Sequence, residues 1–278
     1  MDELAFSPVG RIFVRRLARV ANCFRGLAVC LLLALPAGPA FAQDKQCAVV
    51  LMHGKWGNTR YISFFENRLE PVCAYRSIEV PWSGARNYDE PYPVAIAQIK
   101  TEVARFRQQG FKRVFVAGHS FGANAALAYM AVEGDVDGII ALAPGHAPFY
   151  MYDKGISKGA VDKARRLVAD GKGDETVEMD DLNQGVKKAV SMKANVLLSY
   201  FDPEGLGHMQ LTAGKFRKTV PFLYVVGTRV PFYPYGPDLI FNKALQHSSS
   251  QYLVVEADHR GTPDASADLV LEWIKGLL

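Results

Sequence analysis

Short apolar runs recur along the chain after residue 45, and each is bounded by glycine, proline or polar residues. Runs of this length that are rich in valine, isoleucine and phenylalanine are typical of strands buried on both faces of a sheet. We therefore predict strands at residues 47–54, 75–82, 113–118, 136–144, 220–227 and 251–257.

Apolar residues at three- and four-residue spacing lie between these runs. In residues 91–110 they alternate with polar positions until Gly110, which is a helix stop. The same reasoning predicts helices at residues 123–134, 237–248 and 266–278. A regular alternation of strand and helix predicts an α/β fold, with a mainly parallel sheet and helices on both faces.

Residues 145–215 interrupt this alternation. The segment is more polar and has no clear buried strand, and we predict helices in it at residues 158–171 and 181–201. The acidic run at residues 174–181 is interpreted as a solvated surface. Because the segment is too long for an ordinary connection, we expect a small helical cap, or lid, inserted into the domain.

Residues 1–42 have a different composition. They contain five arginines against two acids, then an apolar run at residues 26–35 and small residues up to Ala42. This order is typical of a secretory signal, and we predict cleavage after Ala42. A membrane anchor would need roughly 20 apolar residues, about twice this run. We therefore expect export, to the periplasm or outside the cell, with no stable membrane span in the mature domain of residues 43–278.

Composition and charge narrow the classes further. With 278 residues, 49% of them hydrophobic, the chain is long enough for one large globular domain. The formal net charge is +4, but residues 1–42 carry +3, so the remainder has +1, which argues against nucleic-acid binding. Cys47 and Cys73 remain after cleavage, and export favours a disulfide over two buried free thiols. Two cysteines do not make a metal site, and we expect no metal and no cofactor.

The sequence GHSFG places Ser120 between Gly118 and Gly122, directly after a predicted strand and before a predicted helix. This is the context that the G-x-S-x-G motif requires, because the sharp turn needs glycines and lifts the serine hydroxyl above the sheet edge. The alternative is a tight structural turn. We predict that Ser120 is a nucleophile.

A serine nucleophile needs a base and donors for the oxyanion. His259 follows the last predicted strand, in the chain order of a Ser-His site, whereas a lone loop histidine is otherwise a surface residue. The loop MHGKWGN follows the first strand, and the main-chain N–H of Lys55 or Trp56 would face that of Phe121. We predict this set as an oxyanion hole and leave the choice between Lys55 and Trp56 open.

These motifs together resemble the α/β-hydrolase superfamily, with LMHGKWG, VFVAGHSFGANAA, FLYVVGTRVP and EADHRGTP in the family's order. The resemblance implies the α/β-hydrolase fold over residues 46–278 apart from the cap, and an exported esterase or lipase-like enzyme. It also implies a carboxylate in the loop after the penultimate strand. Val230 stands where that Asp is expected, which is a departure from the family's pattern.

Another carboxylate could orient the histidine instead. Asp202, at the end of the cap's second predicted helix, is the first candidate, with a turn-forming Asp-Pro as the alternative. Asp238 is the next, although it is well placed to cap a helix. Glu256 and Asp258 rank lower, because their closeness in sequence to His259 makes a good approach to its ring harder.

Two classes of function follow. The first is a serine hydrolase that cleaves a small-molecule carboxylic ester or thioester through an acyl-enzyme on Ser120, with His259 as the general base. Acyl transfer to another alcohol would use the same residues. The second is a non-catalytic binding protein on the same fold, which the substitution at Val230 motivates. Retention of both Ser120 and His259 favours catalysis.

Overall fold

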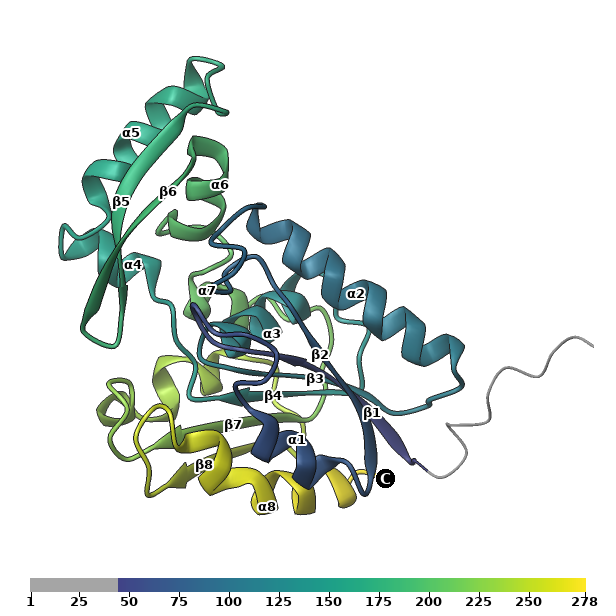
Figure 1. Ribbon diagram of the computed structural model, residues 1–278. Helices are drawn as coiled ribbons and strands as arrows, with labels where there is room; N and C mark the ends of the chain where they lie inside the picture. Colours follow the sequence, from purple (N-terminus) through teal and green to yellow (C-terminus); the bar gives the residue numbers. More distant parts are fainter. Residues whose placement is uncertain (1–44) are drawn as a thin grey trace, which may run out of the picture. The chain divides into compact units, whose positions relative to one another are not determined.

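The computed structural model describes residues 45–278, so the predicted secretory signal lies outside the described residues. Six parallel strands form one sheet in the order β2-β1-β3-β4-β7-β8, as Figure 1 shows. Their bounds are Cys47–Met52 for β1, Cys73–Ile78 for β2, Val114–His119 for β3, Gly138–Leu142 for β4, Phe222–Gly227 for β7 and Gln251–Val255 for β8. All six predicted strands are present.

Helices cover both faces of the sheet (Figure 1). On one face lie α2 (Tyr92–Gln108) and α3 (Phe121–Val132), and on the other lie α1 (Ser63–Leu69) and α8 (Thr262–Lys275). Side chains of a strand point alternately to the two faces, so Val50 packs in the core under α2 and α3 while its neighbour Val49 packs under α1 and α8. This arrangement confirms the predicted fold class.

Two parts of the helix prediction were wrong outside the cap. The short helix α1 was not predicted. Residues 237–248 do not form an α-helix but contain the 3₁₀ turns Pro237–Leu239 (η2) and Phe241–Lys243 (η3), which follow a similar turn at Tyr233–Tyr235 (η1). Ile240 separates the last two turns because its φ of −135° is outside the helical range, and its buried side chain packs in the core.

The segment expected to form a cap, residues 145–215, lies between β4 and β7, and the name cap is kept for it below. It contains four helices and a hairpin: α4 (Pro148–Asp153), α5 (Lys158–Ala169), β5 (Thr176–Asn183), β6 (Val186–Lys193), α6 (Ala194–Phe201) and α7 (Met209–Ala213). The helix predicted at residues 158–171 is present as α5. The helix predicted at residues 181–201 is wrong over residues 181–193, which belong to the antiparallel hairpin β5–β6.

In the first strand of the hairpin buried and exposed residues alternate, although its acidic residues make the sequence look uniformly polar. Val177, Met179 and Asp181 are buried while the residues between them are exposed, so the acidic run is a two-faced strand and not simply a solvated surface. Gln184 and Gly185 connect the strands with φ values of 49° and 80°. Two consecutive residues with positive φ are the turn that matches the twist of a two-residue hairpin.

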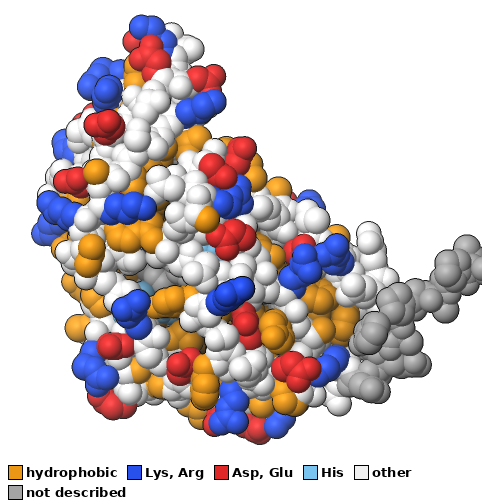
Figure 2. All heavy atoms as spheres, viewed as in Figure 1, with side chains coloured by type: hydrophobic (Ala, Val, Ile, Leu, Met, Phe, Trp, Pro, Cys, Tyr) orange, Lys and Arg blue, Asp and Glu red, His pale blue; other side chains and the backbone are white. Residues whose placement is uncertain are grey.

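A disulfide joins Cys47 and Cys73, which are paired residues at the start of the neighbouring strands β1 and β2. The sequence therefore identified the right pair, and the alternative of two free thiols is excluded. On the face shown in Figure 2, basic and acidic side chains are interspersed. In the described part of the chain, no helix is both long and apolar enough to cross a membrane.

Candidate active site

Ser120 lies in the turn between β3 and α3, and its backbone is strained, with φ of 56° and ψ of −116°. The flanking glycines are required by close packing. A Cβ atom added to Gly118 would lie 2.2 Å from the carbonyl carbon of Gly122, and one added to Gly122 would lie 2.3 Å from the carbonyl oxygen of Met52. The strand and helix thus meet without side chains between them, and the serine is held at the carboxyl end of the sheet.

His259 follows β8 and precedes α8, and it converges with Ser120 at Gly145. A Cβ atom added to Gly145 would lie 2.8 Å from Ser120 Oγ and 3.5 Å from His259 Cε1. The Nε2 atom of His259 is buried and has no hydrogen-bond partner among residues 45–278. Burial lowers the pKa of His259 to about 4, so its ring is neutral near pH 7 and can accept a proton.

His119, the residue before Ser120, supports the loop that carries His259. Its Nε2 atom donates a hydrogen bond of 2.8 Å to the main-chain carbonyl of His259, and its ring stacks on Tyr61 with centroids 5.5 Å apart. Burial lowers the pKa of His119 to about 3, so this ring is also neutral. The contact joins residues that are far apart in the chain, so no local pattern in the sequence indicates it.

The main-chain groups of the predicted oxyanion loop have different partners. The N–H of Trp56 donates to the carbonyl of Trp82 at 2.9 Å, so it is already used. The carbonyl of Gly54 accepts from His53 Nδ1 at 2.8 Å and from the N–H of Gly57 at 3.1 Å. In a trans peptide the N–H points opposite to the carbonyl, so the N–H of Lys55 points away from these donors.

The N–H of Lys55 donates to no acceptor in the described part of the chain. Phe121 is the first residue of α3, where an N–H has no intrahelical partner. Of the two candidates, Trp56 therefore has an N–H that is already bonded, whereas the N–H of Lys55 is not. Two such donors beside Ser120 are what an oxyanion hole requires.

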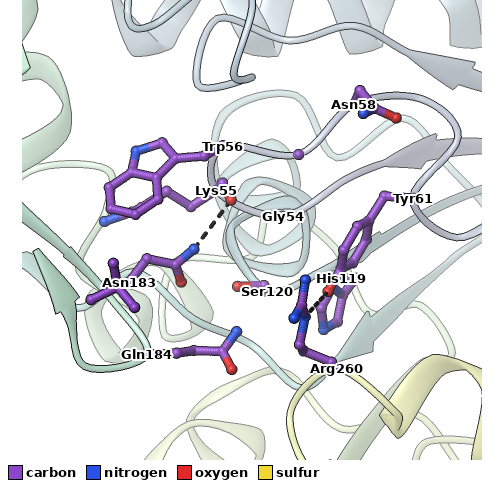
Figure 3. Close-up of a pocket in the computed structure, with 12 residues that line it drawn as sticks. Gly54, Lys55, Trp56, Asn58, Tyr61, His119, Ser120, Asn183, Gln184 and Arg260 are labelled. Carbon is purple, nitrogen blue, oxygen red and sulfur yellow. Dashed lines mark hydrogen bonds between the residues drawn. The ribbon is translucent and has the colours of Figure 1, made fainter. Parts of the chain in front are cut away.

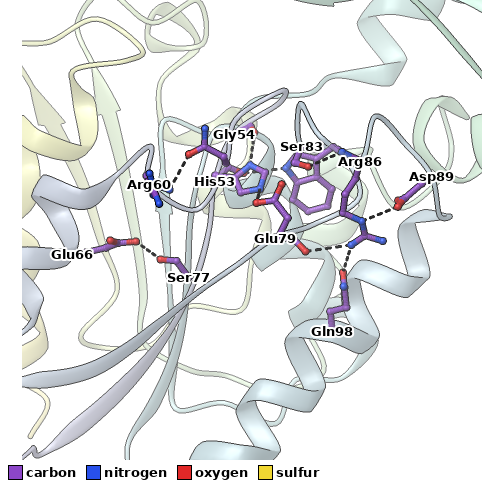
Figure 4. Close-up of polar contacts among 12 residues, drawn as sticks. His53, Gly54, Arg60, Glu66, Ser77, Glu79, Ser83, Arg86, Asp89 and Gln98 are labelled. Carbon is purple, nitrogen blue, oxygen red and sulfur yellow. Dashed lines mark hydrogen bonds and ion pairs between the residues drawn. The ribbon is translucent and has the colours of Figure 1, made fainter.

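A polar network behind this loop fixes it to the segment after β2 (Figure 4). Trp82 Nε1 donates to the carbonyl of His53 at 3.0 Å. Arg86 in turn donates to the carbonyl of Glu79 at 3.2 Å and pairs with Asp89 at 2.9 Å. The loop that carries the candidate oxyanion donors is therefore hydrogen-bonded to the segment after β2, which has hydrogen bonds and an ion pair of its own.

The first two candidate acids have partners other than His259. Val230 is buried, with 3% of its surface exposed, and contributes an apolar side chain where the family's acid is expected. Asp202 accepts from Arg165 at 3.0 Å within the cap, and Asp238 accepts from Asn242 at 2.5 Å on the surface.

The remaining candidates are exposed and also have partners. Glu256 pairs with Arg229 at 2.6 Å, and Asp258 accepts from the N–H of Gly261 at 2.7 Å. Asp258 still acts on His259 through space, because its charge raises the pKa of the ring against the larger effect of burial. Across residues 45–278, no carboxylate hydrogen-bonds the ring of His259, and the identity of the acid stays an untested prediction.

A pocket of about 450 Å³ opens above Ser120 (Figure 3). It is lined by main-chain and polar groups from the oxyanion loop, by the hairpin turn of the cap and by the loop after β8: Gly54, Lys55, Trp56, Gly57, Asn58, Tyr61, His119, Ser120, Asn183, Gln184, Val186 and Arg260. These lining residues include no acid, and they include the guanidinium of Arg260. Within residues 45–278 no group of His, Cys, Asp or Glu could hold a metal ion.

Sequence reasoning missed a buried contact beside the pocket. Lys55 Nζ lies 2.6 Å from a carboxylate oxygen of Asp181, a residue of the cap hairpin. Asp181 was interpreted as part of a solvated acidic run. The buried alternation of β5 was the only local sign that its side chain points inward.

Comparison with known proteins assigns the chain to a family. The sequence profile of the alpha/beta hydrolase family matches residues 49–276. Similar solved structures include a carboxyl esterase from Bacillus coagulans in complex with glycerol, with 15% identity and a TM-score of 0.62 over 84% of this chain and 91% of that one. No curated protein sequence matches the chain.

Two further solved structures are similar in fold. One is a monoacylglycerol lipase from Paleococcus ferrophilus, with 18% identity and a TM-score of 0.58 over 82% of this chain and 94% of that one. The other is Est1E from Butyrivibrio proteoclasticus with bound ferulic acid, with 19% identity and a TM-score of 0.54 over 86% and 90%. At these identities the likeness shows the fold, whereas the family profile covers most of the sequence. The chain belongs to the α/β-hydrolase family.

Proposed function

We propose that the protein is a serine hydrolase that cleaves a small carboxylic ester or thioester through an acyl-enzyme on Ser120. The observation that carries this proposal is the convergence at Gly145 of the strained Ser120 and the buried, neutral ring of His259. A structural turn alone would have no need for this convergence. The similar solved structures named as esterases and lipases agree with the proposal.

In the first half of the reaction, Ser120 Oγ attacks the substrate's carbonyl carbon while His259 Nε2 takes the hydroxyl proton. The carbonyl oxygen becomes an oxyanion, which accepts hydrogen bonds from the N–H groups of Phe121 and Lys55. The tetrahedral intermediate then collapses. The bond to the leaving group breaks, and His259 donates its proton to the departing alcohol or thiol.

In the second half, water replaces the leaving group. His259 takes a proton from the water as its oxygen attacks the acyl carbon, and the same two N–H groups hold the second oxyanion. Collapse releases the carboxylic acid and returns the proton from His259 to Ser120 Oγ. If an alcohol takes the place of water, the same residues perform acyl transfer.

The orientation of His259 needs a source other than the usual carboxylate. We propose that the hydrogen bond from His119 to the carbonyl of His259, together with burial of both rings, supplies part of it. A carboxylate would also stabilise the histidine cation, and an enzyme without one is expected to turn over more slowly. A slow enzyme with a reactive serine is therefore the expected phenotype.

The pocket indicates the size of the substrate, and the disulfide indicates the compartment. A volume of about 450 Å³ suits a small molecule. The disulfide between Cys47 and Cys73 agrees with export, because disulfides persist in oxidising compartments. We propose a small-molecule ester or acyl substrate and a periplasmic or secreted location.

The competing function is a non-catalytic binding protein, which is favoured by the lack of a carboxylate on the ring of His259. Labelling with a fluorophosphonate probe distinguishes the two. We expect the probe to modify Ser120, located by peptide mass spectrometry, and we expect Ser120→Ala to stay unlabelled and His259→Ala to label much more slowly. An unlabelled wild-type protein, beside an esterase control that reacts, would support the binding protein instead.

A further inference from the structure

Lys55, Asp181 and Tyr88 form a buried contact between three separate segments. Lys55 Nζ lies 2.6 Å from Asp181 Oδ1, and Tyr88 donates to Asp181 Oδ2 at 2.6 Å. The side chains of Lys55 and Asp181 are only 3% and 0% exposed. Lys55 belongs to the candidate oxyanion loop, Tyr88 to the connection between β2 and α2, and Asp181 to the cap hairpin.

Further hydrogen bonds and two aromatic rings surround the ion pair. Lys55 Nζ donates to the carbonyl of Leu182 at 3.0 Å, and the N–H of Leu182 donates to Asp181 Oδ1 at 2.8 Å. The ammonium group also lies 5.9 Å and 5.6 Å from the ring centroids of Phe121 and Phe201. The ion pair is therefore buried and surrounded by protein groups, unlike an incidental pair on the surface.

Stability alone does not explain such a pair. Removing two charges from water costs free energy that their attraction does little more than offset, and well-packed apolar residues are often as stable. In some proteins a buried ion pair instead fixes the relative position of the segments that carry the charges. Here it defines the position of Lys55 relative to the hairpin.

The hairpin also holds the main chain of Lys55. Asn183 Nδ2 donates to the carbonyl of Lys55 at 3.3 Å, as the dashed line in Figure 3 shows, while the N–H of the same peptide, from Trp56, donates to Trp82 at 2.9 Å. Both ends of the peptide that follows Lys55 are therefore fixed. The hairpin turn, with Gln184, lines the pocket at the same time.

We propose that Asp181 is a positioning residue that locks the cap hairpin onto the oxyanion loop, so that the N–H of Lys55 faces the reacting carbonyl. This inference rests on the proposed function. The contact stabilises the oxyanion through the N–H of Lys55, and this oxyanion forms in the transition state but is absent from the bound ester. Its loss therefore lowers kcat more than it raises KM.

The test is hydrolysis of p-nitrophenyl acetate by Asp181→Asn, which keeps the shape and removes the charge. We expect kcat to fall at least about tenfold, since a single oxyanion donor contributes about 10²–10³ in rate, with KM within about twofold. Asp180→Asn is the matched control, because Asp180 is the exposed neighbour on the opposite face of β5. We expect it to keep the wild-type kcat and KM.

A second variant protects the test from misfolding. Lys55→Met combined with Asp181→Leu and Tyr88→Phe removes both charges and the hydroxyl that donates to Asp181, so no buried charge or hydroxyl of this contact is left unpaired. We expect this triple variant to unfold at a urea concentration near that of wild type while its kcat stays at least about tenfold lower. Wild-type kcat in either folded variant, or a rise in KM with kcat unchanged, overturns the inference.

The inference and the proposed function can fail separately. If the wild-type protein hydrolyses no ester and its Ser120 resists the fluorophosphonate probe, the proposed function fails. If the wild-type protein is active and labelled while Asp181→Asn keeps its kcat, only the positioning role of Asp181 fails.

Discussion

The Nε2 atom of His119 donates a hydrogen bond of 2.8 Å to the main-chain carbonyl of His259. The residue before the proposed nucleophile therefore holds the loop of the proposed base. This contact joins the loop of His259 to the residue before Ser120 without any carboxylate, and it gives the first prediction.

Replacing His119 with Phe keeps a ring that can stack on Tyr61 but removes the donor to His259. We expect kcat for p-nitrophenyl acetate to fall about tenfold, because a displacement of the base by a fraction of an ångström weakens proton transfer. His208→Phe is the control, since His208 stacks on Phe149 in the cap and does not line the pocket. Equal kcat values for the two variants would remove the support role of His119.

The pH dependence of kcat/KM reports the pKa of His259. Burial lowers this pKa to about 4, so the ring stays neutral and basic until the pH falls through that value. We expect kcat/KM to change little between pH 7 and pH 5, whereas a base with an ordinary pKa near 6.5 would lose about thirtyfold by pH 5. Rates from pH 3.5 to 8 decide the point, and an acid limb near 6.5 contradicts it.

Stability should depend on pH in the direction that buried histidines dictate. In the unfolded chain histidine side chains take up protons with a pKa near 6.5. In the folded protein burial lowers the pKa of His119 to about 3 and that of His259 to about 4. The unfolded state thus binds more protons below pH 6.5, and the free energy of unfolding falls as the pH falls from about 6.5 toward 4. Urea unfolding at each pH measures this slope, and His119→Phe should make it shallower; an unchanged slope counts against a neutral, buried His119.

The strain at Ser120 has a measurable cost. Alanine at this position removes the hydroxyl but keeps a Cβ atom at φ of 56° and ψ of −116°, whereas glycine adopts this conformation freely. We expect Ser120→Gly to be about 1 kcal/mol more stable than Ser120→Ala, since such strain costs about 1–3 kcal/mol and glycine loses some of this gain in the unfolded state. Both variants lack the hydroxyl, so the difference between their urea midpoints reports the strain less the entropic cost of glycine. A less stable glycine variant would argue against a strained turn.

Gly145 lies against both Ser120 and His259, so a side chain there would crowd the hydroxyl of Ser120. A methyl group there would lie 2.8 Å from Ser120 Oγ, and the φ of Gly145 is not in the left-handed region, so alanine fits the backbone. We expect Gly145→Ala to fold, to lose at least about a hundredfold in kcat/KM and to resist the fluorophosphonate probe. Gly159→Ala is the control, because a Cβ atom there meets nothing within 4 Å. Normal labelling of Gly145→Ala would show that the space beside Gly145 is not needed for attack by Ser120.

Two cationic residues, Lys55 and Arg260, line the pocket. The charge of Lys55 is paired with Asp181, whereas among residues 45–278 Arg260 forms no ion pair and donates to the hydroxyl of Tyr61 at 3.4 Å. We expect Arg260→Gln to lower kcat/KM for p-nitrophenyl hemisuccinate about two- to fivefold, the range of an exposed ion pair. Hydrolysis of p-nitrophenyl butyrate, which has the same acyl length without the charge, should not change. Arg229→Gln, at an exposed arginine outside the pocket, is the control. Equal losses on both esters would exclude charge recognition.

Local pattern was enough for the sheet and for the sharp strand-to-helix turn that carries the proposed nucleophile. A strand buried on both faces must be apolar over its length, and a turn as tight as the one at Ser120 must have glycines beside it, so both leave a signature within a few residues. The position of His259 after the last strand followed from chain order for the same reason. The pairing of Cys47 with Cys73 followed from there being two cysteines after residue 42.

Tertiary structure alone decided how these parts are held together. The choice of Lys55 over Trp56 depends on a hydrogen bond to Trp82, and the burial of Asp181 depends on Lys55, 126 residues earlier in the chain. An acidic residue in an exposed run and one in a buried ion pair look alike in sequence, because only the partner neutralises the cost of burial. Sequence by itself pointed to the groups proposed for the chemistry, and only the tertiary structure decided which contacts hold those groups in place, because the contacts join residues far apart in the chain.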